Sequence, residues 1–300
     1  MSVELPLCIN PRIKDNHDSA FSLSILEKHE SFSNKWIIEK FMILKYKKYL
    51  TYNNPFQLYW KCFKSKIIIF YKNKNIINII KKQLSRGRYV HVQINEKYIP
   101  NRLSYKKFDY SHNLLIYGFN ESGKIYTIAY NADGHYTTQE ICENQLFQAY
   151  KECKDFPIGQ IYTFNVRKNF DFNSLDVKKL KKLAKRYLNP RNSKTGINAY
   201  NYLLNDIKTA IAKELSLDMR SFRTLFEHAE TILSIHEHFS LSSSLVSRMK
   251  KNASLSKMLF YTALKYEMYH DKASLNEVLK CFLVYYEEEK KILQEIINSL

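Results

Sequence analysis

A histidine and two further polar side chains lie at opposite ends of one predicted hairpin. In the stretch "DYSHNLLIYGFNESGKIYTIAYNADGHY", His112 opens an apolar run, and Asn131 and Asp133 follow the second run after a turn. Imidazole is the side chain that most often changes charge near neutral pH, and it serves widely as a general acid or base. At the head of an apolar strand, His112 therefore either satisfies a local hydrogen bond or carries out proton transfer.

Strands must position these residues. The segments "HNLLIYGFN" and "KIYTIAYN" are predicted to form a hairpin around "NESGK", where Gly123 serves the turn. Before them, "RYVHVQINEKYIP" alternates apolar and polar residues up to Pro100, which is typical of a strand. After them, "ENQLFQAYKEC" is predicted to be a helix and "QIYTFNV" a closing strand.

Helices are predicted ahead of this sheet. The segment "SAFSLSILEKH" follows Asp18 and begins with Ser19, and both residue types are good N-caps. The segment "NKWIIEKFMILKYKK" places Trp36, Ile37 and Phe41 on one helical stripe. Helices followed by strands that gather later in the chain indicate an α+β unit.

From Asn173 onward, apolar residues recur with the period of a helix. Five segments repeat apolar residues at spacings of three and four, and several begin after Asp, Ser or Gly. We therefore expect a bundle of about five helices. The predicted fold is α+β, with a unit built on an antiparallel sheet at residues 1–170 and an all-α helical bundle at residues 171–300.

The composition favours a soluble, unsecreted chain. Its 300 residues are 45% hydrophobic and 14% aromatic, enough to bury two ordinary cores. No apolar run approaches the roughly 20 residues that cross a bilayer, and Glu4 stands where a signal peptide carries Lys or Arg. The cysteines form no CxxC pair, which argues against a zinc site or a disulfide framework and favours the reducing cytoplasm. They are Cys8, Cys62, Cys142, Cys153 and Cys281.

The hairpin and its surroundings resemble a known family. The segment "INEKYIPNRLSYKKFDYSHNLLIYGFNESGKIYTIAYNADGHYTTQEICENQLFQAY" is similar to the sheet half of papain-like, C39-peptidase-like domains of the butirosin-biosynthesis protein H family. The resemblance lies in a strand opened by His, a hairpin that contains Gly, and a strand that ends in Asn or Asp. A weaker similarity continues through "LDMRSFRTLFEH" in the helical half.

This resemblance implies a triad of Cys, His and Asn or Asp. In such a triad the imidazole deprotonates a thiol, and the third side chain fixes the tautomer of the imidazole. His112 would be the base and Asn131 the orienting residue, with Asp133 as the alternative. We expect His112 and Asn131 to lie within reach of one hydrogen bond or one bridging water.

The nucleophile that the family implies has no clear counterpart here. Its cysteine begins a core helix, where the helix dipole lowers the thiol pKa, but the helix start in this chain reads His17, Asp18 and Ser19. Cys8 lies further upstream and is the first candidate, against a role as a small packing residue. Ser19 is the second candidate, and aminolysis without a covalent intermediate remains a third route.

The charge points to acidic partners. The net charge of +18 concentrates anions, although a Lys-, Asn- and Ile-rich composition typical of AT-rich genomes accounts for part of it. The run "VKKLKKLAKRYLNPRNSK" at residues 177–194 holds eight Lys or Arg and no acid. It is either a solvated helix face or a docking site for an acidic acyl or peptidyl carrier protein. No motif supports nucleic-acid binding, and no membrane partner is expected.

The resemblance therefore implies an acyl or aminoacyl transferase of natural-product biosynthesis, such as nonribosomal peptide pathways. It would form an amide from a carrier-protein thioester and a small amine acceptor. No cofactor of its own is expected, because the substrate brings the phosphopantetheine thioester. The alternative is a non-catalytic member of the same fold that binds a partner or ligand, and a hydrolase would differ only in admitting water.

Overall fold

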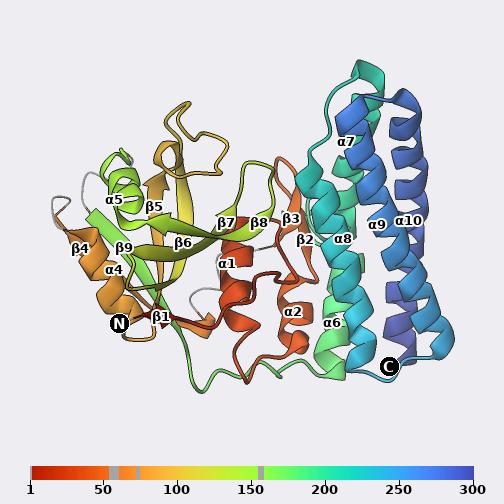
Figure 1. The fold of residues 1–300 in the computed structure, drawn as a ribbon. Coiled ribbons are helices and arrows are strands. Elements are labelled where there is room, and N and C mark those ends of the chain that lie inside the picture. The colour runs from red at the N-terminus through yellow and green to blue at the C-terminus, as the bar shows by residue number, and fades with distance from the viewer. Residues whose placement is uncertain (1, 54–60, 72–74, 155–158) are drawn as a thin grey trace. The chain divides into compact units, whose positions relative to one another are not determined.

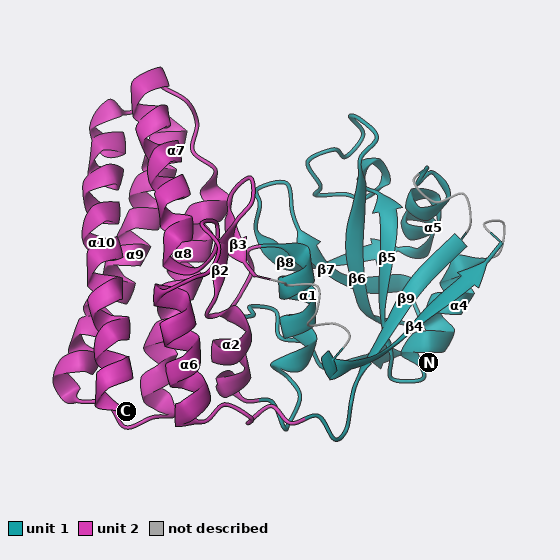
Figure 2. Ribbon diagram, turned by 180° about the vertical axis from the view of Figure 1, so that it is seen from behind, with its two compact units in different colours: residues 1–12, 16–32, 56–170 teal, residues 13–15, 33–55, 171–300 magenta. Residues whose placement is uncertain are grey.

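The chain forms two compact units, which Figure 2 colours separately. The computed structural model describes residues 2–53, 61–71, 75–154 and 159–300. Unit 1 comprises residues 1–12, 16–32 and 56–170, and unit 2 comprises residues 13–15, 33–55 and 171–300. The sequence placed the division at residue 170, and it assigned residues 33–55 to the first unit rather than to the second.

Unit 1 is built on an antiparallel sheet (Figure 1). Its strands lie in the order β4-β9-β5-β6-β7-β8, and β1 pairs with the end of β6. They are β1 (Val3–Glu4), β4 (Phe63–Phe70), β5 (Tyr89–Asn95), β6 (Ser111–Phe119), β7 (Lys124–Tyr130), β8 (Tyr136–Cys142) and β9 (Gly159–Val166). The predicted hairpin, the strand before it and the closing strand are confirmed as β6–β7, β5 and β9. Because the unit combines this sheet with helices, the α+β class is also confirmed.

The register of the central strands brings two chain segments together. Ile94 pairs with His112 and Asn95 pairs with Ser111, at the end of β5 and the start of β6. The residue that follows β5 is therefore held beside the first residues of β6.

At its other end, β6 passes close to β1, and only glycine fits there. A Cβ at Gly118 would lie 2.6 Å from the carbonyl oxygen of Val3 and 2.7 Å from the ring of Tyr126. The register with β7 shifts between Ile116 and Gly118, as expected of a β-bulge. Gly118 therefore permits the close approach of β1 to β6.

Helices and a short 3-10 turn accompany the sheet in the part of unit 1 that the structure describes. They are α1 (His17–Leu26), α4 (Ile76–Leu84), η1 (Glu96–Tyr98) and α5 (Glu143–Lys151). Helices α4 and α5 contact β5, whereas α1 contacts β7. Helix α1 begins before the predicted caps, because the side chain of Asn16 accepts a hydrogen bond from the N–H of Ser19 at 3.0 Å.

Unit 2 contains the helical bundle that the sequence predicts. Its helices are α2 (Asn34–Phe41), α6 (Val177–Leu188), α7 (Ala199–Lys213), α8 (Met219–Leu233), α9 (Ser243–Tyr269) and α10 (Lys272–Ser299), with the 3-10 turns η2 (Gly196–Asn198) and η3 (Ser234–Glu237). Helix α10 contacts α6, α7 and α9, and α8 packs on α9. Among the described residues, no helix combines the length and apolar character needed to span a membrane.

Residues 33–53 fold with the bundle because their apolar side chains are buried there. Helix α2 and the hairpin of β2 (Leu44–Tyr46) and β3 (Leu50–Tyr52) bury Trp36, Phe41 and Tyr52. Both α2 and β3 contact α8, and the N–H of Tyr46 donates to the carbonyl oxygen of Lys194 at 2.7 Å.

A buried carboxylate joins several helices of unit 2. Glu289 on α10 accepts hydrogen bonds from the hydroxyls of Tyr187 (2.6 Å), Tyr200 (2.9 Å) and Tyr285. Nδ1 of His228 on α8 lies 3.5 Å from the same carboxylate. Burial alone would raise the pKa of Glu289, but His228 and the bonds from Tyr187 and Tyr285 outweigh it, and the pKa is lowered. Glu289 is therefore a charged group in the core of the bundle.

Candidate active site

Two histidines from distant parts of the sequence meet in unit 1. His17 is the first residue of α1, and His112 is the second residue of β6. Their ring centroids lie 4.0 Å apart, and the rings meet edge to face at 84°. The ring of Tyr130, at the end of β7, lies 5.0 Å from that of His17. The start of α1 is therefore placed against the histidine that the sequence singled out.

A buried glutamate orients His112. Nδ1 of His112 lies 2.8 Å from Oε1 of Glu96, the residue that directly follows β5. Because a carboxylate only accepts hydrogen bonds, Nδ1 carries the proton, and Nε2 of the neutral ring is the basic nitrogen. The side chain of Glu96 is 6% exposed and that of His112 is 21% exposed, so the ring reaches solvent while its partner does not.

Asn95 fixes the conformation of the segment between β5 and β6, which begins with Glu96. Its side-chain oxygen accepts hydrogen bonds from the N–H groups of Lys97 (3.1 Å) and Tyr110 (3.2 Å), and its nitrogen donates to Asp109 at 2.9 Å. The N–H of Glu96 in turn donates to the carbonyl oxygen of Tyr110 at 2.9 Å. These hydrogen bonds join the two ends of the segment between β5 and β6, and they hold Glu96 beside the start of β6.

A buried arginine balances the charge of Glu96. Nε of Arg102 lies 3.9 Å from Oε1 of Glu96, and Nη1 donates to the carbonyl oxygen of Tyr130. Arg102 is 4% exposed. Burial lowers the pKa of its guanidinium, and the nearby Glu96 opposes that shift. The site thus contains one buried cation and one buried anion behind His112.

His17 is a neutral group. Burial, followed by the neighbouring His112, His91 and Arg102, lowers the pKa of His17 to about 3. Its Nε2 is buried without a hydrogen-bond partner among the described residues. A ring that stays neutral and is enclosed by other rings can position His112, but it is poorly placed to exchange protons with solvent.

The structure does not pair the predicted orienting residue with His112. The side-chain oxygen of Asn131 accepts hydrogen bonds from the N–H groups of Asp133 (3.0 Å) and His135 (2.8 Å), within its own turn. The short turn between β7 and β8 needs these bonds, and they occupy the amide. Asp133 is exposed in the same turn. Glu96 holds the position at Nδ1 that the sequence analysis assigned to Asn131.

Cys8 lies at the other end of α1. Its N–H donates to the carbonyl oxygen of Ser24 at 2.8 Å, and its Sγ lies 3.6 Å from Oε2 of Glu27. Glu27 is ten residues beyond His17, and ten residues of helix span about 15 Å. Burial and the charge of Glu27 raise the pKa of the Cys8 thiol. This cysteine is neither next to His112 nor activated.

Ser19, the second candidate nucleophile, is enclosed in the first turn of α1. Its side chain is fully buried, and its N–H is used by the cap of Asn16. Its Oγ has no hydrogen-bond partner among the residues described, so no base is in contact with it. A hydroxyl in this position is not set up for attack on a substrate.

Sequence reasoning missed Glu96 but contained a signal for it. An acid directly after an alternating strand stands out, and antiparallel pairing of residues 89–95 with the start of the next strand brings that acid to His112. His17 was visible as the residue that stands at the helix start. Its contact with His112 needed the three-dimensional placement of α1.

Comparison with known proteins gives no information about this site. No protein-family model matches the chain, and no curated protein matches it. Within the described ranges, no three His, Cys, Asp or Glu side chains come together in a way that could hold a metal ion. What the site offers is a base oriented by a buried carboxylate, next to a neutral imidazole.

Proposed function

We propose that unit 1 is an acyl or aminoacyl transferase in which His112 acts as a general base. The observation that carries the proposal is the 2.8 Å bond between Nδ1 of His112 and the buried Glu96, with the ring itself still reaching solvent. A carboxylate in this position fixes the tautomer and orientation of the imidazole and stabilises the imidazolium that forms during proton transfer. The unit would be a papain-like variant in which His17, not a cysteine, begins the core helix.

The reaction would join an amine to the acyl group of a thioester. Nε2 of His112 takes a proton from the amine as its nitrogen attacks the thioester carbonyl carbon. The C–N bond forms, the C–S bond breaks, and His112 returns the proton to the departing sulfur. The products are an amide and a free thiol, and no oxidant or reductant takes part.

Direct aminolysis fits the site better than a covalent intermediate on the enzyme. Cys8 is bonded to Glu27 at the far end of α1, and its thiol pKa is raised. The neutral, enclosed ring of His17 would hold His112 in place through their edge-to-face contact. The amine itself is then the nucleophile, and His112 supplies the proton transfer.

The acyl donor would be the phosphopantetheine thioester of an acyl or peptidyl carrier protein. Carrier proteins of this kind are generally acidic, and the run at residues 177–194 exposes several lysines on α6. Opposite charges speed the encounter of two proteins and make it sensitive to salt. We place the reaction in natural-product biosynthesis, with a small amine as acceptor.

A second candidate is a non-catalytic protein of the same fold that binds a partner or ligand. The observation that favours it is the histidine at the start of α1, where the resembled family has its thiol. In that case the contacts among His17, His112 and Glu96 would only stabilise the unit. The two candidates differ in one result, which is whether His112 is needed for product formation.

The test is formation of an amide by the full chain. A panel of small acyl thioesters and amines is incubated with the protein, and amide products are measured by mass spectrometry. We expect His112→Ala to reduce the rate by about 100-fold or more, the usual contribution of a general base. Cys8→Ser should leave the rate unchanged.

The control variant is His135→Ala, which removes an exposed histidine from the turn after β7. Its rate should equal that of the original protein. Equal rates for His112→Ala and His135→Ala would support the non-catalytic candidate. Loss of the rate in Cys8→Ser would mean that a thioester on the enzyme does form.

A further inference from the structure

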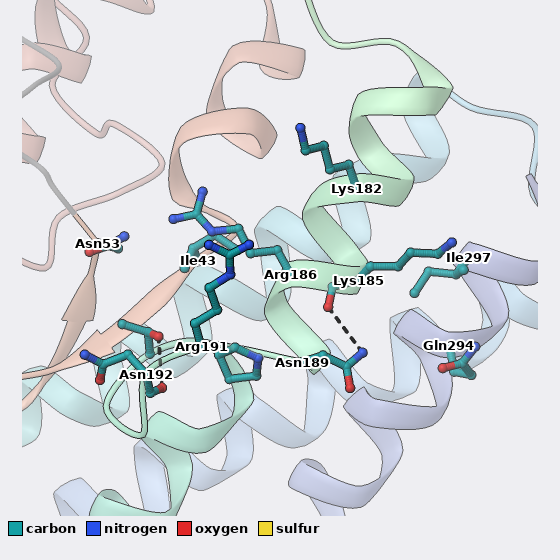
Figure 3. A pocket seen from close by; sticks show the side chains of 12 residues that line it. Ile43, Asn53, Lys182, Lys185, Arg186, Asn189, Arg191, Asn192, Gln294 and Ile297 are labelled. Carbon is teal, nitrogen blue, oxygen red and sulfur yellow. Dashed lines mark hydrogen bonds between the residues drawn. The ribbon is translucent and has the colours of Figure 1, made fainter.

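Unit 2 contains a basic pocket whose cations belong to the run at residues 177–194, distinct from the site of acyl transfer proposed for unit 1. It encloses about 810 Å³ and is open to solvent (Figure 3). Its cations are Lys182, Lys185 and Arg186 of α6 and Arg191 of the loop that follows. Its size falls within the range of small-molecule sites in proteins, which is about 300–1,000 Å³.

The four cations of this pocket have no acidic partner among the described residues. The lining includes no Asp or Glu, and none of the four forms an ion pair with any residue that the structure describes. Gln294 of α10 lines the pocket as a neutral side chain, and its neighbour Glu295 pairs with Arg248 instead. Like charges gathered without counterions repel one another, so an anion in their midst would stabilise the arrangement.

The two arginines converge from different elements. Figure 3 shows that Arg186, from the helix, and Arg191, from the loop, both extend toward the side of Ile43 and Asn53, whereas Lys185 extends toward Ile297. A guanidinium presents its N–H groups in a planar fork that matches phosphate oxygens. Two such forks directed to one side of a cavity form an arrangement suited to a group with several phosphate oxygens.

The loop that carries Arg191 is held by specific contacts. The side chain of Asn189 donates to the carbonyl oxygen of Lys185 at 3.4 Å, and that of Asn192 accepts from the N–H of Lys194 at 2.7 Å. The backbone of Thr195 then forms an antiparallel bridge with Lys45 of β2. Arg191 is thus presented by a structured loop, which lowers the entropy cost of ordering it around a ligand.

The remainder of the lining combines aliphatic side chains with neutral polar ones and contains no aromatic ring. Ile43, Pro190 and Ile297 contribute aliphatic surface next to the charged groups. Inorganic phosphate would leave this aliphatic surface exposed. The combination favours a compact ligand that has an anionic end and an organic end.

We propose that this pocket binds an organic diphosphate. The phosphates would lie between Arg186 and Arg191, with Lys182 and Lys185 completing the positive field, and the organic group would contact Ile43, Pro190 and Ile297. The inference rests on the geometry of unit 2 alone and does not depend on acyl transfer by unit 1.

The test is calorimetric titration of the full chain with three probes, ADP, geranyl diphosphate and inorganic pyrophosphate. The first two distinguish a nucleotide from an alkyl diphosphate as the source of the same anionic group. At least one of them should bind saturably and more tightly than pyrophosphate, which lacks the organic end. The double variant Arg186→Gln/Arg191→Gln should weaken that binding by at least about tenfold, which is about 1.4 kcal/mol.

The matched control is Lys178→Gln/Lys181→Gln, which removes two charges from the same helix outside the pocket. It should change the affinity by less than about twofold, since neither side chain lines the pocket and surface charges are screened by salt. Equal weakening in both double variants would overturn the proposal, because the effect would then be one of overall charge. Absence of saturable binding by all three probes would also overturn it.

Binding of a macromolecule in the pocket is the remaining result that would refute the proposal. The same titration is repeated with a single-stranded RNA oligonucleotide and with an acidic carrier protein. Binding of either one that is lost in Arg186→Gln/Arg191→Gln and is not displaced by any diphosphate would assign the pocket to that macromolecule and refute the small-molecule site.

Discussion

The neutral His17 makes a quantitative prediction about acid stability. Its pKa is about 3 in the folded protein and about 6.5 in an unfolded chain. Between these values the unfolded state binds a proton and the folded state does not. The free energy of unfolding therefore falls as the pH is lowered from 6.5 toward 3, and it levels off below the folded value.

The size of this effect follows from the pKa difference. At pH 4.5, which is two units below the pKa in the unfolded chain, protonation of the unfolded state lowers the free energy of unfolding by 1.36 kcal/mol per unit, or about 2.7 kcal/mol. His17→Phe removes the titration and keeps a ring against Phe21 and Tyr130, which lie 5.7 and 5.0 Å from His17. Between pH 7 and pH 4.5, the free energy of unfolding of the variant should fall by about 2–3 kcal/mol less than that of the original protein.

Hydrogen exchange measured by mass spectrometry is the suitable assay, because the chain has two units and a global melt would mix them. Peptides from α1 and β6 report on unit 1. His135→Phe, in the exposed turn after β7, serves as the matched control and should follow the original protein. Parallel pH curves for His17→Phe and the original protein would refute the enclosed, neutral His17.

Four further predictions concern other parts of the chain. Glu96 and Arg102, 3.9 Å apart, attract each other by about 4 kcal/mol at an effective dielectric constant of about 20. A double-mutant cycle of Glu96→Gln with Arg102→Met should therefore give a coupling of about 2–4 kcal/mol, and a value near zero would contradict the buried pair. Glu289→Gln should destabilise unit 2 above pH 4.5. The stability that Glu289→Gln loses, measured by hydrogen exchange of α10, should become smaller as the pH falls. The lowered pKa of Glu289 contributes stability only while the carboxylate is ionised. Gly118→Ala should lower the stability of unit 1, measured by hydrogen exchange of β6, by about 1–3 kcal/mol, and unchanged exchange would mean that β1 is displaced at no cost. Cys8 should be alkylated by iodoacetamide more slowly than free cysteine at pH 7.5, and rapid labelling would contradict its raised thiol pKa.

Periodicity predicted most of the fold because the relevant interactions are local. The alternation in residues 89–95 and the turn at Gly123 specify strands, and the spacing of apolar residues after position 171 specifies helices. The strand β8 was missed because only Ile141 of "YTTQEIC" is fully buried, and the segment has no regular alternation of apolar and polar residues. Helix α9 begins at Ser243, where the side chain of Ser242 supplies the cap.

The site was harder to predict because it depends on contacts distant in sequence. His112 was identified from its place in a strand, and the structure does bring it to other titratable groups. Its partner was assigned to Asn131 on the basis of hairpin spacing, but the local needs of a tight turn occupy that amide. Glu96 reaches His112 through strand register and the bonds of Asn95, which a sequence pattern does not display.

The division of unit 2 among three chain segments has a consequence for synthesis. Helix α2 and the β2–β3 hairpin leave the ribosome before residues 56–170, whereas α8, on which they pack, follows later. At about 5–20 residues per second, the intervening segment alone takes about 6–23 s to translate. During that interval Trp36, Phe41 and Tyr52 have no bundle to bury them. A fragment that stops at residue 170 would keep these side chains exposed, so the sheet unit is expected to aggregate when expressed that way and to remain folded in a fragment that omits residues 33–55.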